Sequence, residues 1–234
     1  WMEGSGPHAD IVLSTRVRLA RNLQGHTFGT RPQGDEPEQI RSRVREAVAR
    51  GTLARDGVAL DLDTLPALTR QILLERHLIS RELAGCAGGD PPRGAGLIMA
   101  PGEQVGALVN EEDHLRLQAL LSGLRLWDAY QLVDRLDEEL GAHLPYAYHP
   151  EFGYLTSCPT NVGTGLRASV FMHLPGLVLT KEIGKVLQGI GQVGLTFRGL
   201  YGEGSEVVGN FFQISNQTTL GKSEEDLIDH LQKI

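Results

Sequence analysis

Cysteine, lysine and long apolar runs are scarce in this sequence of 234 residues. Two cysteines, Cys86 and Cys158, are too few for a disulfide framework, which favours a reducing cytoplasm. No run approaches the roughly 18 apolar residues of a membrane helix, and Trp1-Met2-Glu3-Gly4 does not resemble the start of a signal peptide. With 41% hydrophobic residues the chain can still bury a substantial core, so a soluble globular protein is expected.

The basic residues are unusual in kind and in distribution. A net charge of −7 argues against a general nucleic-acid-binding surface, which needs an excess of lysine and arginine. Only 4 of the 22 basic residues are lysines, and six of the 18 arginines gather in residues 16–21 and 41–45. Arginine offers phosphate and carboxylate a planar fork that lysine lacks. The ratio therefore indicates anion binding or a codon bias of the whole genome, and composition leaves both open.

Residues 157–167, SCPTNVGTGLR, combine more potential chemistry than any other segment. Gly163 and Gly165 allow backbone amides to approach an anion, and Arg167 can bind an oxyanion through two hydrogen bonds. No lysine follows the glycines, so the phosphate-binding lysine of P-loop proteins is absent. The same residues also suit an ordinary loop with a small buried cysteine, and the segment alone does not decide between the two.

Two further segments carry clustered charges. Residues 10–18 begin with an apolar run and then alternate between polar and apolar side chains, which places Arg16 and Arg18 on one side of an extended strand. Two neighbouring cations of this kind indicate either an anion-binding site or a solvated edge strand. Residues 110–116, NEEDHLR, put three acids, His114 and Arg116 directly after a predicted buried strand, where charged groups are held rigidly. Consecutive residues cannot all face one ion, so a metal site built from protein alone is the weaker interpretation.

Hydrophobic periodicity predicts the elements around these motifs. Strands are expected near residues 97–100, 105–109, 151–156, 193–197 and 207–214, and residues 85–96 are expected to form a mobile loop. Helices are expected over residues 35–51, with a capping box at Asp35 and Glu38, and over residues 127–144. Two more are expected to begin after N-caps at Thr180 and Ser223. A further helix is expected from residue 64, with Leu68, Ile72, Leu73 and Leu78 towards the core.

The charged segments together suggest phosphoryl transfer. Arginines at positions 16, 18, 116, 167 and 198 lie at strand ends or in turns, and several cations around a triphosphate supply the charge neutralisation that this reaction needs. Glu112 and Glu203 remain for the acceptor, and a carboxylate can bind a guanidinium bidentately and take its proton. A Cys158 thiolate beside these cations can help to hold that group.

The motifs resemble those of the phosphagen (ATP:guanidino) kinases in order and spacing: TRVR at 15–18, NEEDHLR at 110–116, CPTNVGTGLR at 158–167, Arg198-Gly199 with Gly202-Glu203, and ISN at 214–216. The resemblance implies an α+β fold with a large, mainly antiparallel sheet flanked by helices. It implies ATP as cofactor, with Mg²⁺ delivered with the nucleotide and no separate metal site. The implied nucleotide-binding residues are Ser14, Arg16, Arg18, Arg116, Gly163, Gly165, Arg167 and Arg198. The resemblance implies four catalytic or acceptor-binding residues. Glu112 acts as the base, Glu112 and Glu203 hold the guanidine, Cys158 lies beside it, and Asp113 completes the set.

Two departures from the family pattern favour one of its branches. Kinases of small metabolites have a helical domain before TRVR, where this chain has only a short lead-in over residues 1–9. They also usually carry a histidine at the position of Phe171, so the resemblance does not decide whether Phe171 contacts the nucleotide. With ERHLIS at 75–80, these features resemble the bacterial protein-arginine kinases, which mark proteins for Clp protease in the stress response. Residues 1–234 are expected to form a single catalytic domain, without the phosphoarginine-binding domain that follows it in those enzymes.

The resemblance therefore implies a cytoplasmic kinase of arginine side chains in proteins. A kinase of a small guanidino metabolite, such as free arginine, and an inactive nucleotide-binding or adaptor module are the alternatives. The expected partners are proteins with exposed arginines, an activator protein, the Clp protease machinery and a second copy of the chain, with no membrane and no nucleic acid.

Overall fold

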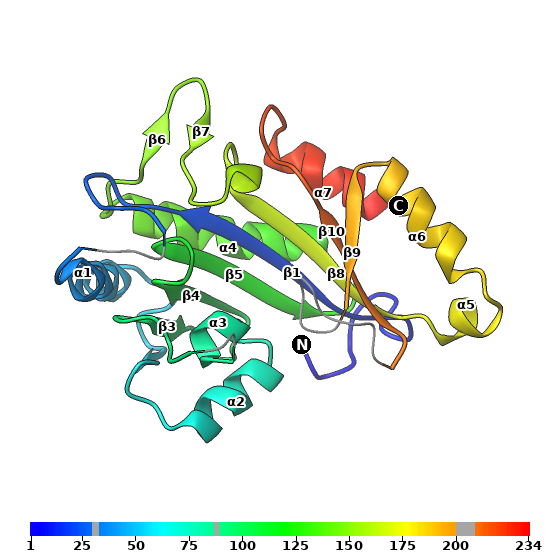
Figure 1. Cartoon of the computed structure of the whole chain (residues 1–234), viewed down its shortest axis with the longest axis horizontal. Helices are drawn as coiled ribbons and strands as arrows, with labels where there is room; N and C mark the ends of the chain where they lie inside the picture. Colours follow the sequence, from blue (N-terminus) through cyan, green and yellow to red (C-terminus); the bar gives the residue numbers. More distant parts are fainter. Residues whose placement is uncertain (30–32, 87–88, 200–208) are drawn as a thin grey trace.

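An eight-stranded sheet forms the centre of the computed structural model, which describes residues 1–29, 33–86, 89–199 and 209–234 (Figure 1). Its strand order is β2-β3-β4-β5-β1-β8-β10-β9, and every neighbouring pair is antiparallel. The strands are β1 (Val12–Arg21), β2 (Val58–Asp61), β3 (Gly96–Met99), β4 (Val105–Val109), β5 (Leu115–Ser122), β8 (Leu166–His173), β9 (Leu195–Arg198) and β10 (Phe211–Asn216). The predicted α+β fold with a large antiparallel sheet is confirmed.

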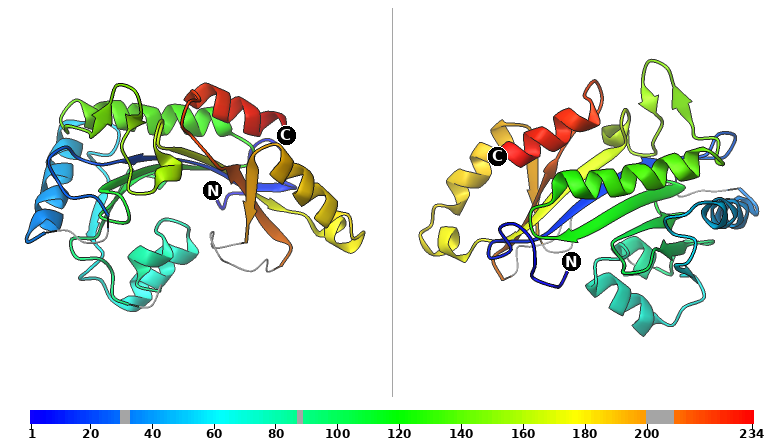
Figure 2. Two further views of the ribbon diagram at one scale, coloured as in Figure 1. Left: turned by 45° about the horizontal axis from the view of Figure 1, so that its top comes forward. Right: turned by 180° about the vertical axis from the view of Figure 1, so that it is seen from behind.

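The described helices are distributed unequally over the two faces of this sheet. Helices α4 (Leu126–Gly141) and α7 (Glu224–Lys233) run along one face, the rear face, whereas α2 (Ala67–Glu75) and α3 (Arg81–Ala84) lie on the other side, near β3 (Figure 2). The remaining elements are α1 (Glu36–Arg50), α5 (Pro175–Leu179), α6 (Ile183–Gln192), the 3₁₀ turn η1 (Pro159–Asn161), and the hairpin β6 (Tyr148–His149) and β7 (Gly153–Tyr154). Within the described residues, no helix is long and apolar enough to cross a membrane.

The central strand β1 shows why the two faces differ. Val17 and Leu19 are fully buried and belong to the same apolar core as the inner residues of α4. Arg16 and Arg18 alternate with them and are half-buried on the opposite, front face. The sequence pattern of β1 thus separates a packed rear face from a charged front face, as the alternation predicted.

Several local predictions were wrong in detail. The Asp35 side chain makes no cap hydrogen bond, and Glu38 instead binds Arg93, so the capping box is not formed. Helix α6 begins at Ile183, while Thr180 ends α5. The N-cap at Ser223 is confirmed, because its Oγ accepts the Asp226 N–H at 3.1 Å.

The predicted core side of α2 was also wrong in part. Leu68 and Ile72 are 74% and 52% exposed, whereas Leu73, Leu74 and Leu78 are buried. Leu68 and Ile72, four residues apart, share the side of α2 that faces solvent, whereas Leu73 and Leu74 lie on the other side and belong to the apolar cluster with α3 and the β3 end of the sheet. The strand predicted over residues 151–156 is reduced to the two residues of β7.

Candidate active site

The register of the sheet brings the predicted arginines onto its front face. Residues that pair across antiparallel strands point to the same side of the sheet. Arg18 on β1 lies opposite Arg167 on β8, and Ala20 lies opposite Arg116 on β5. Arg198 on β9 also points to this face, because it pairs with Gln213 of β10, which pairs in turn with Phe171 of β8. Segments far apart in the sequence therefore present their cations in one place.

A cavity of about 300 Å³ opens where these side chains converge. It joins four of the predicted arginines to Glu112 and Cys158, the residues expected to hold the acceptor. Its lining consists of Arg18, Ala20, Glu112, Arg116, Cys158, Thr160, Asn161, Gly165, Arg167, Arg198 and Gln217. Cationic and acceptor-binding groups thus share one hollow.

Arg16 and Arg18 lack counter-ions within the described part of the chain. Neither guanidinium makes an ion pair or hydrogen bond there, and Nε of Arg18 is buried without a partner. Burial lowers the pKa of Arg16 to about 10, with Glu111 opposing and Arg116 adding to the decrease. Burial and the neighbouring charges of Arg16 and Arg116 also lower the pKa of Arg18. A bound anion would relieve both the desolvation and the repulsion.

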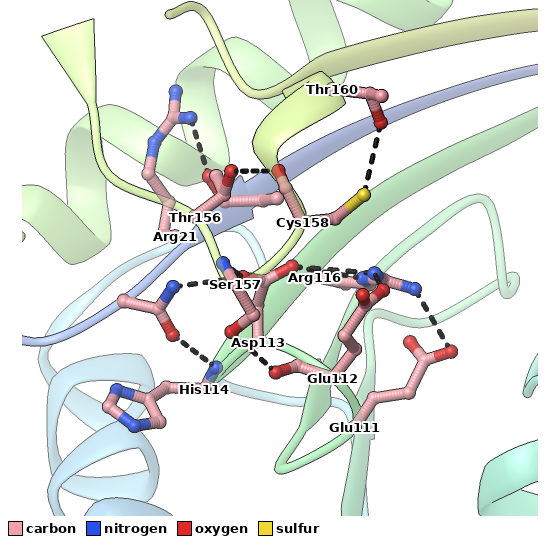
Figure 3. Close-up of polar contacts among 12 residues, drawn as sticks. Arg21, Glu111, Glu112, Asp113, His114, Arg116, Thr156, Ser157, Cys158 and Thr160 are labelled. Atoms are coloured by element: carbon pink, nitrogen blue, oxygen red, sulfur yellow. Dashed lines mark hydrogen bonds and ion pairs between the residues drawn. The ribbon is translucent and has the colours of Figure 1, made fainter. Parts of the chain in front are cut away.

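Arg116, in contrast, is surrounded by carboxylates. Its Nη1 lies 3.1 Å from Oε1 of Glu111 and its Nη2 lies 3.3 Å from Oδ2 of Asp113, while Glu112 forms a further ion pair (Figure 3). Burial alone would lower the pKa of Arg116, but Glu111, Asp113 and Glu112 outweigh it and raise that pKa. Of these acids, Glu112 has the most exposed side chain, at 45%, and it lines the cavity.

Asp113 is enclosed by the framework of the site. It is 1% exposed, and its Oδ1 accepts the side-chain amide of Asn22 at 2.8 Å and the Ser157 N–H at 2.7 Å. Its other oxygen faces Arg116. The side chain does not line the cavity, so its contacts fit a positioning residue that joins the β4–β5 connection to the segment carrying Cys158.

The Cys158 thiol is held at the edge of the cavity. Its Sγ lies 3.0 Å from Oγ1 of Thr160, and the preceding Ser157 donates a hydrogen bond from Oγ to the Glu112 carbonyl at 2.7 Å (Figure 3). The thiol and the Glu112 carboxylate therefore lie on two segments that are joined by a direct hydrogen bond.

His114 turns away from the cavity. Its Nδ1 lies 2.9 Å from the Leu23 N–H and its Nε2 lies 3.0 Å from the Thr27 carbonyl, which is the pattern of a neutral ring that accepts at Nδ1 and donates at Nε2. Burial lowers its pKa, and the Thr27 hydrogen bond opposes this. His114 therefore ties the chain after β1 to the site, and the described residues contain no metal-binding cluster around it.

The two glycines of the 157–167 segment serve different purposes. Gly165 has φ 67° and lines the cavity, and a Cβ there would lie 2.6 Å from the Ala20 carbonyl oxygen. Gly163 has φ 115°, and its N–H donates to the Tyr154 carbonyl at 3.3 Å. Gly165 thus allows β1 and the loop to approach closely, while the amide of Gly163 is used within the protein.

A smaller hollow beside the cavity contains the predicted nucleotide residue Ser14 together with Arg16, His77 and Phe171. The ring centroids of His77 and Phe171 lie 5.7 Å apart. His77 has φ 56°, an uncommon backbone conformation for this residue. An imidazole therefore stands beside Phe171, although it comes from the end of α2 and not from β8. Glu203 lies outside the described residues.

Comparison with known proteins identifies the family. Residues 39–234 match the family model described as ATP:guanido phosphotransferase, C-terminal catalytic domain. The chain belongs to the ATP:guanido phosphotransferase family. This confirms the family predicted from the motifs.

Proteins named protein-arginine kinase are among the relatives of this chain, which spans about two thirds of their length. Those of Bacillus cereus (strain AH187) and Bacillus anthracis are each 47% identical over 236 residues, which covers 100% of this chain and 65% of theirs. Among solved structures, the duplicated taurocyamine kinase from Schistosoma mansoni with bound transition state analog components has a TM-score of 0.87 at 28% identity, over 97% of this chain and 32% of that one. Lombricine kinase, with a TM-score of 0.79 at 23% identity over 96% of this chain and 64% of that one, supports the fold alone.

Two residues at or near the site were not singled out from the sequence. Glu111 is only 8% exposed and its Oε2 is buried without a hydrogen-bond partner among the described residues. Arg21 points to the rear face, where it binds Asp137 of α4 and donates to the Thr164 carbonyl at 2.8 Å. The alternation of β1 predicts that Arg21 and Arg18 point to opposite faces of the sheet. The partners of Arg21 are seen only in the folded structure.

Proposed function

We propose that this chain transfers the γ-phosphate of ATP to arginine side chains of proteins. The observation that carries the proposal is the single cavity in which Arg18, Arg116, Arg167 and Arg198 face Glu112 and Cys158. Cations for a triphosphate and a carboxylate for a guanidinium are the two requirements of guanidino phosphorylation. The choice of a protein acceptor rests on the relatives named protein-arginine kinase.

The arginines and Glu112 have separate parts in the proposed reaction. A guanidinium nitrogen gives a proton to the Glu112 carboxylate, a step that is needed because the pKa of arginine lies above about 12. The freed electron pair forms a bond to the γ-phosphorus, while the bond from that phosphorus to the β–γ bridging oxygen breaks and its electrons leave with ADP. The arginines neutralise the charge on the phosphoryl oxygens as these bonds exchange.

Magnesium is proposed to arrive with the nucleotide, and one residue fits it. Mg²⁺ commonly takes one or two carboxylates and completes its shell with phosphate oxygens and water. Glu111 offers a buried carboxylate oxygen with no other described partner, close enough to Arg16 to raise the pKa of that arginine. Glu111 would hold the ion, which supplies additional neutralisation of phosphate charge when it is bound.

A small guanidine is the second candidate acceptor. The structural neighbour named taurocyamine kinase favours it, because its name specifies a small guanidino compound. The remaining expectations, an activator protein, Clp protease, a role in stress, a second copy of the chain and a cytoplasmic location, stay predictions from the family resemblance.

The proposal is tested by measuring phosphoarginine with a protein acceptor and with free arginine. We expect mass spectrometry under non-acidic conditions to detect phosphoarginine in an arginine-rich protein after incubation with Mg-ATP. Glu112→Gln should abolish the signal, whereas Glu138→Gln, which changes an exposed acid on α4, should not. Phosphorylation of free arginine alone would favour the small-guanidine kinase, and ATP binding without any transfer would favour an inactive module.

A further inference from the structure

The β6–β7 hairpin projects outward from the sheet (Figure 1). Its two strands, Tyr148–His149 and Gly153–Tyr154, pair with each other, and residues 148–152 are all exposed. Tyr148 is 57% exposed and Phe152 is 45% exposed. Large aromatic side chains on a projecting ribbon indicate a surface that meets another molecule.

The hairpin is held in shape by rings. A two-stranded ribbon of this length is not stable through its backbone hydrogen bonds alone. Tyr148 and Tyr154 meet edge to face with centroids 5.3 Å apart, and His149 stacks on Phe152 at 4.8 Å. At the base, the Arg21 guanidinium lies 3.5 Å from the centroid of the Tyr154 ring. The exposed rings at the tip are therefore ordered in advance, which reduces the entropy lost on binding.

The base of the hairpin is part of the wall that carries the acceptor-binding groups. Tyr154 N–H donates to the Gly163 carbonyl at 2.8 Å, and the Gly163 N–H returns a bond to the Tyr154 carbonyl at 3.3 Å. Three residues after Tyr154 the chain reaches Ser157, which bonds the Glu112 carbonyl. A polypeptide that places one of its side chains in the cavity must continue over the surface around this wall.

We propose that the β6–β7 hairpin is a docking surface for the polypeptide that carries the acceptor arginine, an inference that rests on the proposed function. The surface suits a basic segment. Aromatic faces attract guanidinium and ammonium groups, and the exposed Glu151 at the tip has no described ion-pair partner. The net charge of −7 adds a favourable long-range field for such a segment. The hairpin would thus select protein acceptors over free guanidines.

The test compares protein and small acceptors in a variant that changes only the tip. We expect the double variant Tyr148→Ala, Phe152→Ala to raise KM for an arginine-rich protein, protamine, about tenfold, since exposed aromatic anchors dominate many interfaces. KM for ATP and for free arginine should stay within twofold of the wild type. Leu179→Ala, which truncates an 81% exposed residue on α5, should change none of these values. Thermal unfolding of each variant checks that the fold is retained.

Binding of protamine without ATP separates this inference from the proposed function. Calorimetry should show a dissociation constant about tenfold weaker in the double variant than in the wild type and in Leu179→Ala. If the wild type forms no phosphoarginine in proteins, the proposed function fails while this binding comparison still stands. An unchanged dissociation constant and protein KM, or an equal loss with free arginine, would overturn the docking surface.

Discussion

Arg18 and Arg21 belong to the same strand and are three residues apart, yet they have opposite surroundings. Arg21 points to the rear face, is 2% exposed, and binds the Asp137 carboxylate through Nε at 3.1 Å and Nη2 at 2.6 Å. Arg18 points to the front face, where burial and the nearby cations Arg16, Arg116 and Arg167 lower its pKa against the weaker opposing effect of Glu111. The rear arginine has its anion built into the fold, whereas the front arginine has a site for an anion that comes from outside.

This difference separates stability from binding. A buried charge that loses its partner destabilises the folded state strongly, because nothing replaces the lost solvation. A buried charge without a partner gains its counter-ion only when a ligand supplies the anion. Removing that charge therefore weakens ligand binding and does not lower the stability of the free protein. The two faces of one strand can therefore be tested against each other by single substitutions.

The largest effect on stability is expected from the rear pair. Asp137→Ala should lower the free energy of unfolding by about 3–5 kcal/mol, because it leaves the Arg21 guanidinium buried beside Tyr154 without a counter-ion. Denaturant unfolding measures the change. Asp128→Ala on the same helix removes an exposed pair with Arg125 and should cost less than about 1 kcal/mol. Equal costs for the two substitutions would show that the rear pair is not special.

The next effect should appear in ligand binding and not in stability. Arg18→Ala should weaken ATP binding by about 1.5–3 kcal/mol, the usual worth of a charged hydrogen bond, and leave the free energy of unfolding within about 0.5 kcal/mol of the wild type. Titration calorimetry and denaturant unfolding give the two quantities. Arg135→Ala, at an exposed position on α4, is the matched control and should change neither. A large loss of stability in Arg18→Ala would contradict the assignment of the front face.

The smallest effect concerns the pH dependence set by His77. Burial, with a contribution from Arg16, lowers the pKa of His77 to about 4. The unfolded chain therefore takes up this proton first, and unfolding should become easier by about 1–2 kcal/mol as the pH falls from roughly 6.5 to roughly 5, still above the folded pKa. His77→Asn, which tolerates φ 56°, should flatten this dependence.

A ligand extends the His77 experiment to the front face. ATP phosphates that neutralise Arg16 should raise the pKa of His77, and an NMR titration of the ring with and without ATP would detect the shift. An unchanged titration midpoint in saturating ATP would place the phosphates away from Arg16.

The sequence was sufficient for the family, the sheet and the side on which Arg16 and Arg18 lie, because motif order and strand alternation are local properties. It was insufficient for contacts set by strand register. Gly163 was expected to offer its amide to an anion, but pairing with Tyr154 uses that amide. Asp113 was grouped with the catalytic residues, but the fold encloses it between Asn22, Ser157 and Arg116.

The amphipathic pattern of α2 failed for a similar reason. The apolar spacing grouped Leu68 and Ile72 with Leu73, but Leu68 and Ile72 share the side of α2 that faces solvent, and Leu73 and Leu74 lie on the side that packs against the core. Apolar residues occur on both sides of this short helix, so spacing alone does not decide which side is buried. The importance of Glu111 likewise depends on the approach of Arg16 from β1, which no spacing in the sequence reveals.

The most direct test of the two-part cavity compares Arg18→Ala with Glu112→Gln in ATP titration and in a single turnover of phosphoryl transfer. We expect Glu112→Gln to bind ATP within about twofold of the wild type and to transfer its phosphate about 10²–10⁴ times more slowly, as for the loss of a general base. Arg18→Ala should bind ATP more weakly. If Glu112→Gln loses ATP affinity instead, or transfers phosphate at the wild-type rate, the cavity is not divided between nucleotide and acceptor as proposed.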